Sequence, residues 1–252
     1  MTLAINLGWL EAFGLSAVRM VAFLVIAPPF STGAFPLRVK GMLAVGLALA
    51  VSPRAAEQYV QGSPGDFLVA LVLELVAGAL LGFLVFVAFS AVQSAGSLID
   101  LFGGFSLAQG FDPQSMVNGA QFARLFQMTA IALLFASGGY LLVMGGLIRS
   151  FEAIPVGSAL TAAVTGPLLI QGTGQMLLAA VQIAGPLIVV LFLADVGMGL
   201  LTRVAPALNA FALSFPLKVL LTLVLAVTTF VGLPAIVESL TGDALELIGG
   251  VR

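Results

Sequence analysis

The sequence contains no cysteine and no histidine among its 252 residues. Their absence excludes disulfide bonds, thiolate nucleophiles, imidazole bases and nearly all zinc, haem and iron–sulfur sites. An enzyme would then need a pair of carboxylates, but the one pair at helical spacing, Asp243 and Glu246, lies in the C-terminal tail. The composition therefore argues against hydrolytic and redox enzymes, and we expect neither a metal nor a cofactor.

Charge is scarce as well. Nine Lys and Arg and eleven Asp and Glu make up 8% of the chain, against about 25% in an average soluble domain. So few charges do not cover the surface of a soluble protein, and 61% of the residues are hydrophobic, which indicates a membrane protein. The net charge of −2 argues against a nucleic-acid partner. No removable signal peptide is predicted, because the N-terminus lacks a basic region.

Long apolar segments occupy most of the chain. A membrane helix needs about 20 apolar residues to cross a hydrocarbon core of about 30 Å. Charges, prolines and glycine clusters divide the sequence into six apolar helices at about 3–27, 39–52, 67–92, 125–148, 175–202 and 207–231. The expected fold class is an all-α, polytopic membrane-associated protein that forms a single membrane domain over residues 1–252.

Two of the predicted segments depart from a simple membrane crossing. Between Lys40 and Arg54 the chain is charge-free for only 13 residues, about 20 Å of helix. This segment is too short to cross a bilayer alone, so we expect it to be half-inserted or packed against protein. The tail from Thr241 onward is expected to be amphipathic and to lie at the membrane interface, and the last two helices are expected to form an antiparallel hairpin.

A pair of small residues in the third segment has two interpretations. Gly78 and Gly82 are four residues apart, so they lie on one helix face and would let another helix approach closely. Alternatively, the pair reflects the high glycine content of the chain, which has 29 glycines. The sequence favours neither interpretation.

Ionisable residues inside apolar helices are candidates for function, because burying a charge in a membrane is costly. Glu74, Asp195 and Lys218 lie in such segments, and Glu11 and Arg19 share the first helix. One interpretation is that these charges pair with each other or with partner subunits and serve assembly. The other is a proton relay. The charges are scattered and histidine is absent, which favours assembly.

The connection over residues 93–121 is neither a polar loop nor a regular helix, because phenylalanines and glycines are interspersed in it. Irregular backbone at membrane depth is tolerated only where protein or a water-filled cavity satisfies its amides. One interpretation is a segment folded back into the protein, where it plugs or lines a pore. The other is a surface loop at the headgroup interface, and the composition does not separate the two.

Several short motifs occur in a characteristic order along the chain. They are Arg19, Ala27-Pro28-Pro29-Phe30, Pro36-Leu37-Arg38-Val39-Lys40, Gly104-Phe105-Ser106, Phe111-Asp112-Pro113, Ala123-Arg124, Ser150-Phe151 and Ile154-Pro155-Val156-Gly157. In order and spacing they resemble the FliR family, the R component of the flagellar export gate, whose counterpart in injectisomes is the T component of the type III secretion export apparatus. The likeness covers most of the chain and leans toward the flagellar members.

A second likeness lies in the last third. Residues 213–218, Leu-Ser-Phe-Pro-Leu-Lys, are similar to the second helix of the small Q component of the same gate, with the proline one place earlier. The resemblance implies a P-like helical part over 1–174, which includes the central connection 93–121. A Q-like helical hairpin and tail over 175–252 would follow.

The resemblance implies a subunit that is not an enzyme and holds no cofactor. Such a subunit assembles with the P and Q components, FliP and FliQ, into the entrance of a channel. The B component, FlhB, and the export platform lie on the cytoplasmic side, and unfolded proteins thread through the channel. The implied location is the bacterial inner membrane within the flagellar basal body, in contact with lipid and not with nucleic acid.

The resemblance also assigns roles to residues. It implies a closing plug over residues 103–119, and the plug or gating residues are Phe105, Phe111, Asp112, Pro113 and Met116. An apolar constriction of this kind blocks ions by dewetting. The charges expected to be buried or to lie between subunits are Arg19, Glu74, Arg124, Asp195, Arg203 and Lys218.

The alternative function is a small-solute permease or channel that works alone or as a homo-oligomer. Its polytopic hydropathy and charges inside apolar helices support it. Many transporters are built from two repeated halves around a polar site at the membrane midplane. The sequence shows no repeated half and no clustered polar site, which argues against a permease.

Overall fold

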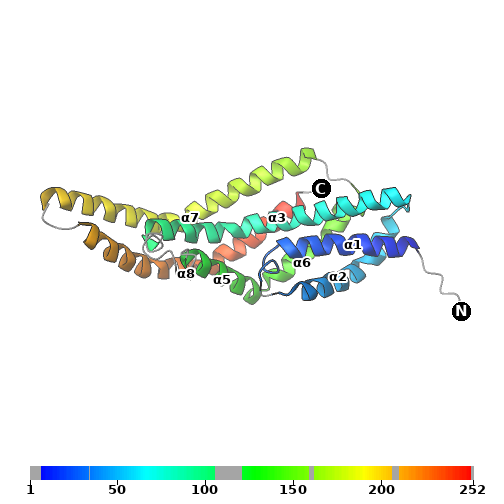
Figure 1. The fold of residues 1–252 in the computed structure, drawn as a ribbon, viewed down its shortest axis with the longest axis horizontal. Coiled ribbons are helices and arrows are strands. Elements are labelled where there is room, and N and C mark those ends of the chain that lie inside the picture. Colours follow the sequence, from blue (N-terminus) through cyan, green and yellow to red (C-terminus); the bar gives the residue numbers. More distant parts are fainter. Residues whose placement is uncertain (1–6, 34, 106–120, 159–161, 206–209, 251–252) are drawn as a thin grey trace, which may run out of the picture. The chain divides into compact units, whose positions relative to one another are not determined.

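The computed structural model describes residues 7–33, 35–105, 121–158, 162–205 and 210–250. Within these ranges the chain forms seven helices and no strand (Figure 1). They are α1 (Leu7–Ile26), α2 (Leu37–Gln58), α3 (Pro64–Phe102), α5 (Gln121–Ala136), α6 (Gly139–Ala153), α7 (Ala162–Val204) and α8 (Ala210–Gly249). The all-α prediction is confirmed.

Five of these helices are long and apolar enough to cross a membrane. They are α1, α2, α3, residues 165–204 of α7 and residues 212–249 of α8, with mean hydropathies between 1.3 and 2.6. Helices α5 and α6, separated by a short break, count as a sixth candidate if they are taken together. This agrees with the predicted class of polytopic membrane protein, with about six apolar spans.

The chain divides into two compact units. Unit 1 comprises Met1–Ala88, Leu134–Thr173 and Leu240–Arg252, and unit 2 comprises Phe89–Leu133 and Gly174–Ser239. Helices α3, α5, α7 and α8 contribute residues to both units. Each unit has its own buried apolar side chains, including Leu15 and Phe23 in unit 1 and Phe126 and Leu191 in unit 2.

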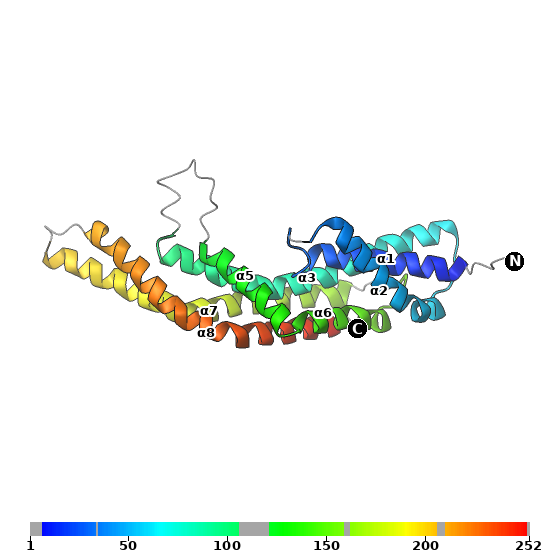
Figure 2. The ribbon, with the colours of Figure 1, turned by 90° about the horizontal axis from the view of Figure 1, so that it is seen from below.

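In unit 1, α1 lies alongside α2 (Figures 1 and 2) and also packs closely on α3. A side chain at Gly78 would collide with the backbone carbonyl oxygen of Arg19, and one at Gly82 would lie 3.0 Å from the carbonyl oxygen of Phe23. Only glycine allows the two backbones to come this near. Of the two interpretations of this glycine pair, the helix contact is confirmed.

Helix α2 is longer than the sequence predicted. We expected a segment over 39–52 that was too short to span, but the helix has 22 residues, about 33 Å. The length prediction was wrong because charges were used to mark the ends of the segment. Arg38, Lys40 and Arg54 all lie inside the helix, and Pro53 does not end it.

The fourth predicted segment, 125–148, is broken. Helix α5 ends at Ala136 and α6 begins at Gly139. Gly138 lies between them with a φ of +73°, in the left-handed region that disfavours a side chain. Because apolar periodicity continues across the break, hydropathy alone does not reveal it.

Two other helix ends lie beyond their predicted positions. Helix α3 continues to Phe102 rather than 92, so the first ten residues of the predicted connection 93–121 are helical. Helix α8 continues through the predicted tail to Gly249. Within unit 1, Ala244 and Leu247 of this tail are buried, and Leu245 approaches Gly146 of α6. The tail therefore packs on protein through one face.

Candidate functional site

The base of the central connection is built in unit 2, where α3 ends. Gly103 follows the helix, and a side chain at this position would lie 2.8 Å from the hydroxyl oxygen of Thr222 on α8. Gly104 has a φ of +82°, with the ring of Phe215 about 3.5 Å from where a side chain would start. The chain leaves α3 through two positions that suit glycine, so its exit is fixed against α8.

Asp100, in the last turn of α3, caps the helix that follows the connection. Its Oδ1 accepts a hydrogen bond from the backbone N–H of Phe122 at 3.0 Å, and its Oδ2 accepts one from that of Ala123 at 3.0 Å. Both donors belong to the first turn of α5, whose amides have no partner within the helix. The carboxylate also complements the positive end of the helix dipole, and Asp100 is only 3% exposed.

The two helices approach closely at the same place. A side chain at Gly96, one turn before Asp100, would lie 2.5 Å from the Cα of Ala123. The end of α3 and the start of α5 are therefore held together by backbone packing and by a buried carboxylate. This arrangement holds the end of α3 next to the start of α5.

A row of aromatic rings begins at this base and continues within unit 2. The ring centroids lie 5.2 Å apart for Phe105 and Phe122, 6.1 Å for Phe122 and Phe126, and 5.0 Å for Phe126 and Phe230. All three contacts are edge-to-face, the geometry in which the positive ring edge meets the negative ring face. The row connects the end of α3 through α5 to α8.

The structure describes only one of the predicted plug residues. Phe105 lies at the base and takes part in the aromatic row. Phe111, Asp112, Pro113 and Met116 lie outside the described residues. Sequence reasoning missed Asp100 and Phe122. Asp100 could have been recognised from the sequence, because it is the one charge between a long apolar segment and the glycine-rich connection.

A second polar cluster is the buried ion pair of unit 1. Arg19 of α1 and Glu74 of α3 are both 0% exposed. The Arg19 Nε donates to Glu74 Oε2 at 2.5 Å, and its Nη2 donates to Oε1 at 2.9 Å. The pair is bidentate, the strongest geometry for a guanidinium and a carboxylate. These two predicted charges are thus brought together within the chain.

The ion pair also holds the end of α6. The Arg19 Nη1 donates to the carbonyl oxygen of Ile154 at 3.0 Å, and its guanidinium lies 4.1 Å from the ring centre of Phe151. Glu74 Oε1 accepts a further bond from the N–H of Gly157 at 2.8 Å. The Ser150-Phe151 and Ile154–Gly157 motifs therefore form one buried network with Arg19 and Glu74, in which the charges are fully hydrogen-bonded.

The remaining predicted charges lie in unit 2 and are more accessible. Lys218 of α8 pairs with Asp195 of α7, with 2.6 Å between Nζ and Oδ1, and their side chains are 20% and 45% exposed. Arg124 and Arg203 are exposed, and neither forms an ion pair with a described residue. The structure therefore brings four of the six charges into two intramolecular pairs.

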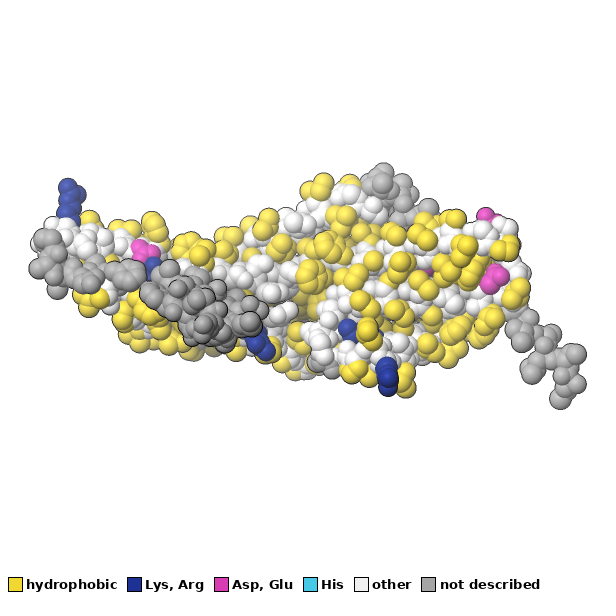
Figure 3. All heavy atoms as spheres, viewed as in Figure 1, with side chains coloured by type: hydrophobic (Ala, Val, Ile, Leu, Met, Phe, Trp, Pro, Cys, Tyr) yellow, Lys and Arg dark blue, Asp and Glu magenta, His cyan; other side chains and the backbone are white. Residues whose placement is uncertain are grey.

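Besides the Lys218–Asp195 pair, α7 and α8 of unit 2 carry large exposed apolar side chains. Figure 3 shows hydrophobic side chains over much of one face and few charged ones. In unit 2, the large apolar side chains of these two helices that are more than half exposed are Leu177, Leu178, Val181, Val189, Phe192, Leu193, Leu200, Val204, Leu220, Leu223, Val224, Val227 and Val231. Lipid or other protein chains must cover such a surface. Among the described residues, no three acidic side chains lie close enough together to hold a metal ion.

These features define an all-α, polytopic membrane protein with two compact units, each of which contains an ion pair between helices. Comparison with known proteins identifies the family within this class. The chain matches the family described as bacterial export proteins, family 1, over residues 10–244. The chain belongs to this family. The resemblance found in the sequence is thereby confirmed.

Curated relatives match over most of their length. The flagellar biosynthetic protein FliR of Escherichia coli is 32% identical over 211 residues, which cover 84% of this chain and 81% of the relative. The Yop proteins translocation protein T of Yersinia pestis is 31% identical over 79% of this chain and 78% of the relative. The secretion system apparatus protein SsaT of Salmonella typhimurium is 28% identical over 88% of both chains.

Proposed function

We propose that this chain is a subunit of the type III protein export gate and forms, with P and Q components, the entrance through which unfolded proteins leave the cell. The observation that carries the proposal is the family match over residues 10–244, together with relatives named for flagellar biosynthesis, translocation and secretion. The proposed partners are FliP, FliQ and, at the cytoplasmic side, FlhB and the export platform. The subunit acts without catalysing a reaction.

Helix lengths support an assembly only partly surrounded by lipid. Helices α3, α7 and α8 have 39, 43 and 40 residues, about twice the 20 residues that cross a hydrocarbon core. Sections of these helices therefore extend beyond the hydrocarbon, where their exposed apolar side chains need a protein partner. We propose that P and Q subunits cover them, that residues 1–174 are the P-like part and 175–252 the Q-like part, and that the assembly lies in the inner membrane at the flagellar basal body.

We further propose that residues 103–119 close the channel, with Phe105, Phe111, Asp112, Pro113 and Met116 in or beside the closed pore. The support for this role is the base described above. Asp100 and the glycines hold the two ends of the segment together, and the ring of Phe105 begins an apolar row. An apolar closure excludes ions by dewetting and yields to a polypeptide under a driving force.

The test is a deletion of residues 106–116 in cells that carry the other gate components. We expect the gate to assemble in normal amount, because the base lies outside the deletion, and the membrane to conduct ions measurably more than with the intact chain. An unchanged conductance in a fully assembled gate would contradict the plug.

Reconstitution of the purified chain alone separates the gate from a permease. A gate subunit without its partners is expected to show no selective solute flux above that of protein-free vesicles. Saturable transport of a small solute by the chain alone would instead support the permease. Co-purification with FliP and FliQ, measured on the same preparation, tests the proposed partners directly.

A further inference from the structure

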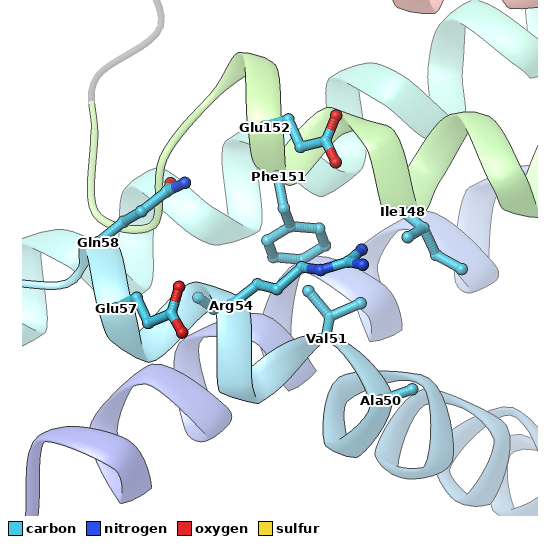
Figure 4. A pocket seen from close by; sticks show the side chains of 9 residues that line it. Ala50, Val51, Arg54, Glu57, Gln58, Ile148, Phe151 and Glu152 are labelled. Carbon is cyan, nitrogen blue, oxygen red and sulfur yellow. The ribbon is translucent and has the colours of Figure 1, made fainter.

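Unit 1 contains a cleft that the proposed function does not use. It lies between the last two turns of α2 and the last two turns of α6 and has a volume of about 280 Å³ (Figure 4). Its floor is apolar and is formed by Val51, Ala55 and Phe151, all of which are buried. The Phe151 ring is held in place because the Arg19 guanidinium packs against it.

Three charged side chains surround this floor. Figure 4 shows the Arg54 side chain extended across the cleft beside the Phe151 ring, with the carboxylates of Glu57 and Glu152 on different sides of it. All three residues are exposed, and none forms an ion pair with another described residue. One cation and two carboxylates around an apolar floor are thus available to a ligand.

The position of these charges along their helices corresponds to the headgroup level of a bilayer. Arg54 and Glu57 lie in the last turns of α2, a candidate span, and Glu152 lies in the last turn of α6. Charged residues at the end of a spanning helix are typical of the membrane–water boundary. A ligand of this cleft is therefore expected to have its polar part at the boundary.

An apolar strip leads from Arg54 along α2 toward the hydrocarbon. Leu43, Leu47 and Ala50 are spaced at about one turn and share the helix face of Arg54. Leu43 and Ala50 are exposed, and Gly46 beside them has open space where a side chain would start. From Leu43 to Arg54 the helix rises about 16 Å, close to the roughly 15 Å of one hydrocarbon leaflet. The strip has the length of a single acyl chain.

We propose that this cleft binds one phospholipid with a zwitterionic headgroup of the phosphatidylethanolamine type. The phosphate accepts hydrogen bonds from the Arg54 guanidinium, the ammonium donates to the carboxylate of Glu57 or of Glu152, and one acyl chain lies along the strip from Ala50 to Leu43. Charge complementarity selects this occupant. A purely anionic headgroup would meet two carboxylates, and a purely cationic ligand would meet the arginine, at a low-dielectric boundary where each mismatch is costly.

The test is native mass spectrometry of the full-length chain purified in detergent, titrated with phosphatidylethanolamine or with phosphatidylglycerol. We expect phosphatidylethanolamine to bind at least fivefold more tightly, and Arg54→Gln to remove at least fivefold of this affinity. The matched control is Arg38→Gln, which removes an exposed arginine from the first turn of the same helix and is expected to change binding less than twofold. The double variant Glu57→Gln with Glu152→Gln is expected to abolish or reverse the preference between the two lipids.

Three results would overturn the proposal. An equal loss of affinity with Arg38→Gln would show general attraction of lipid to basic residues. An unchanged lipid preference in the double glutamine variant would show that the carboxylates do not bind the ammonium. The third is normal lipid binding by Arg54→Gln together with reduced co-purification of another gate component, which would assign the cleft to a protein partner. Because the measurement needs only this chain and a lipid, it is independent of whether the chain serves an export gate.

Discussion

The ion pair of unit 1 and the ion pair of unit 2 join helices in opposite ways. Arg19 and Glu74 are fully buried, bidentate and tied to the backbone at Ile154 and Gly157. Lys218 and Asp195 make a single contact, and their side chains are 20% and 45% exposed. A buried charge that loses its partner is strongly destabilising, whereas an exposed pair contributes little to stability. The first pair therefore belongs to the fold, and the second is accessible to a neighbouring chain.

The surroundings of the two pairs differ as well. In unit 1, glycines at positions 78 and 82 bring α1 and α3 into backbone contact. In unit 2, α7 and α8, which carry the Lys218–Asp195 pair, expose large side chains such as Phe192 and Val231. Unit 1 thus holds its ion pair inside a close helix contact, whereas the pair of unit 2 is accessible to a partner. Large apolar side chains are exposed in both units, including Val72 and Val76 of α3 in unit 1. Substitutions at four places in the fold test this difference, beginning with the largest expected effect.

Separating the buried pair is expected to have the largest effect. Arg19→Ala should lower the free energy of unfolding by about 3–5 kcal/mol, because Glu74 would stay buried without its cation. The measurement is thermal or denaturant unfolding of the purified chain in detergent. The double variant Arg19→Met with Glu74→Leu should recover part of the loss, since no charge is left unpaired. Recovery would be incomplete because the N–H of Gly157 loses its acceptor. A single variant as stable as the intact chain would contradict a structural role for the pair.

Crowding the contact between α1 and α3 is expected to cost somewhat less. Gly78→Ala places a methyl group against the carbonyl oxygen of Arg19, which is backbone and has to move. Overpacking of this kind costs about 1–3 kcal/mol. The matched control is Gly197→Ala in α7, where a side chain would meet nothing within 4 Å and helix propensity predicts a gain of about 0.5–1 kcal/mol. Equal effects of the two substitutions would show that the close approach is unimportant.

Removing the cap of α5 tests the base of the central connection in unit 2. Asp100→Ala leaves the N–H groups of Phe122 and Ala123 without their acceptor, at a cost of about 1–2 kcal/mol. Hydrogen exchange at these two amides should accelerate, while exchange in α1 should not change. Asp100→Asn keeps one acceptor oxygen and is expected to give a smaller effect. Unchanged exchange in the alanine variant would show that the first turn of α5 is held by other contacts.

The sequence predicted the class of fold because hydropathy is an average over many residues. Long charge-free intervals, such as the one between Glu74 and Asp100, located the helices, and the order of short motifs indicated the family. Helix ends were less accurate because a charge was taken as an end. In the fold, Arg54 lies inside α2 with its guanidinium in a cleft, and Asp100 lies inside α3 with both oxygens bonded to α5.

The contacts between residues that lie far apart in the chain could not be predicted from the sequence, for a physical reason. Arg19 and Glu74 are 55 positions apart, and only the packing of α1 on α3 brings their side chains together. The break at Gly138 depends on a positive φ at one glycine among 29, which composition does not single out. The predicted list of charges was therefore useful, but which of them are buried and which remain accessible follows from the helix packing.

Substitutions in the accessible pair are expected to have the smallest effect on stability. Their main effect is expected on the binding of partner subunits. Lys218→Ala or Asp195→Ala should lower the free energy of unfolding by less than about 1 kcal/mol, yet each should weaken co-purification with the components of the proposed gate. The control is Arg203→Ala, an exposed charge of α7 without an ion pair to a described residue. Exchanging the two charges, Asp195→Lys with Lys218→Glu, keeps the internal pair but reverses its polarity. If the exchanged variant co-purified normally, the pair would serve only this chain, whereas continued loss would mean that a neighbouring subunit contacts these charges.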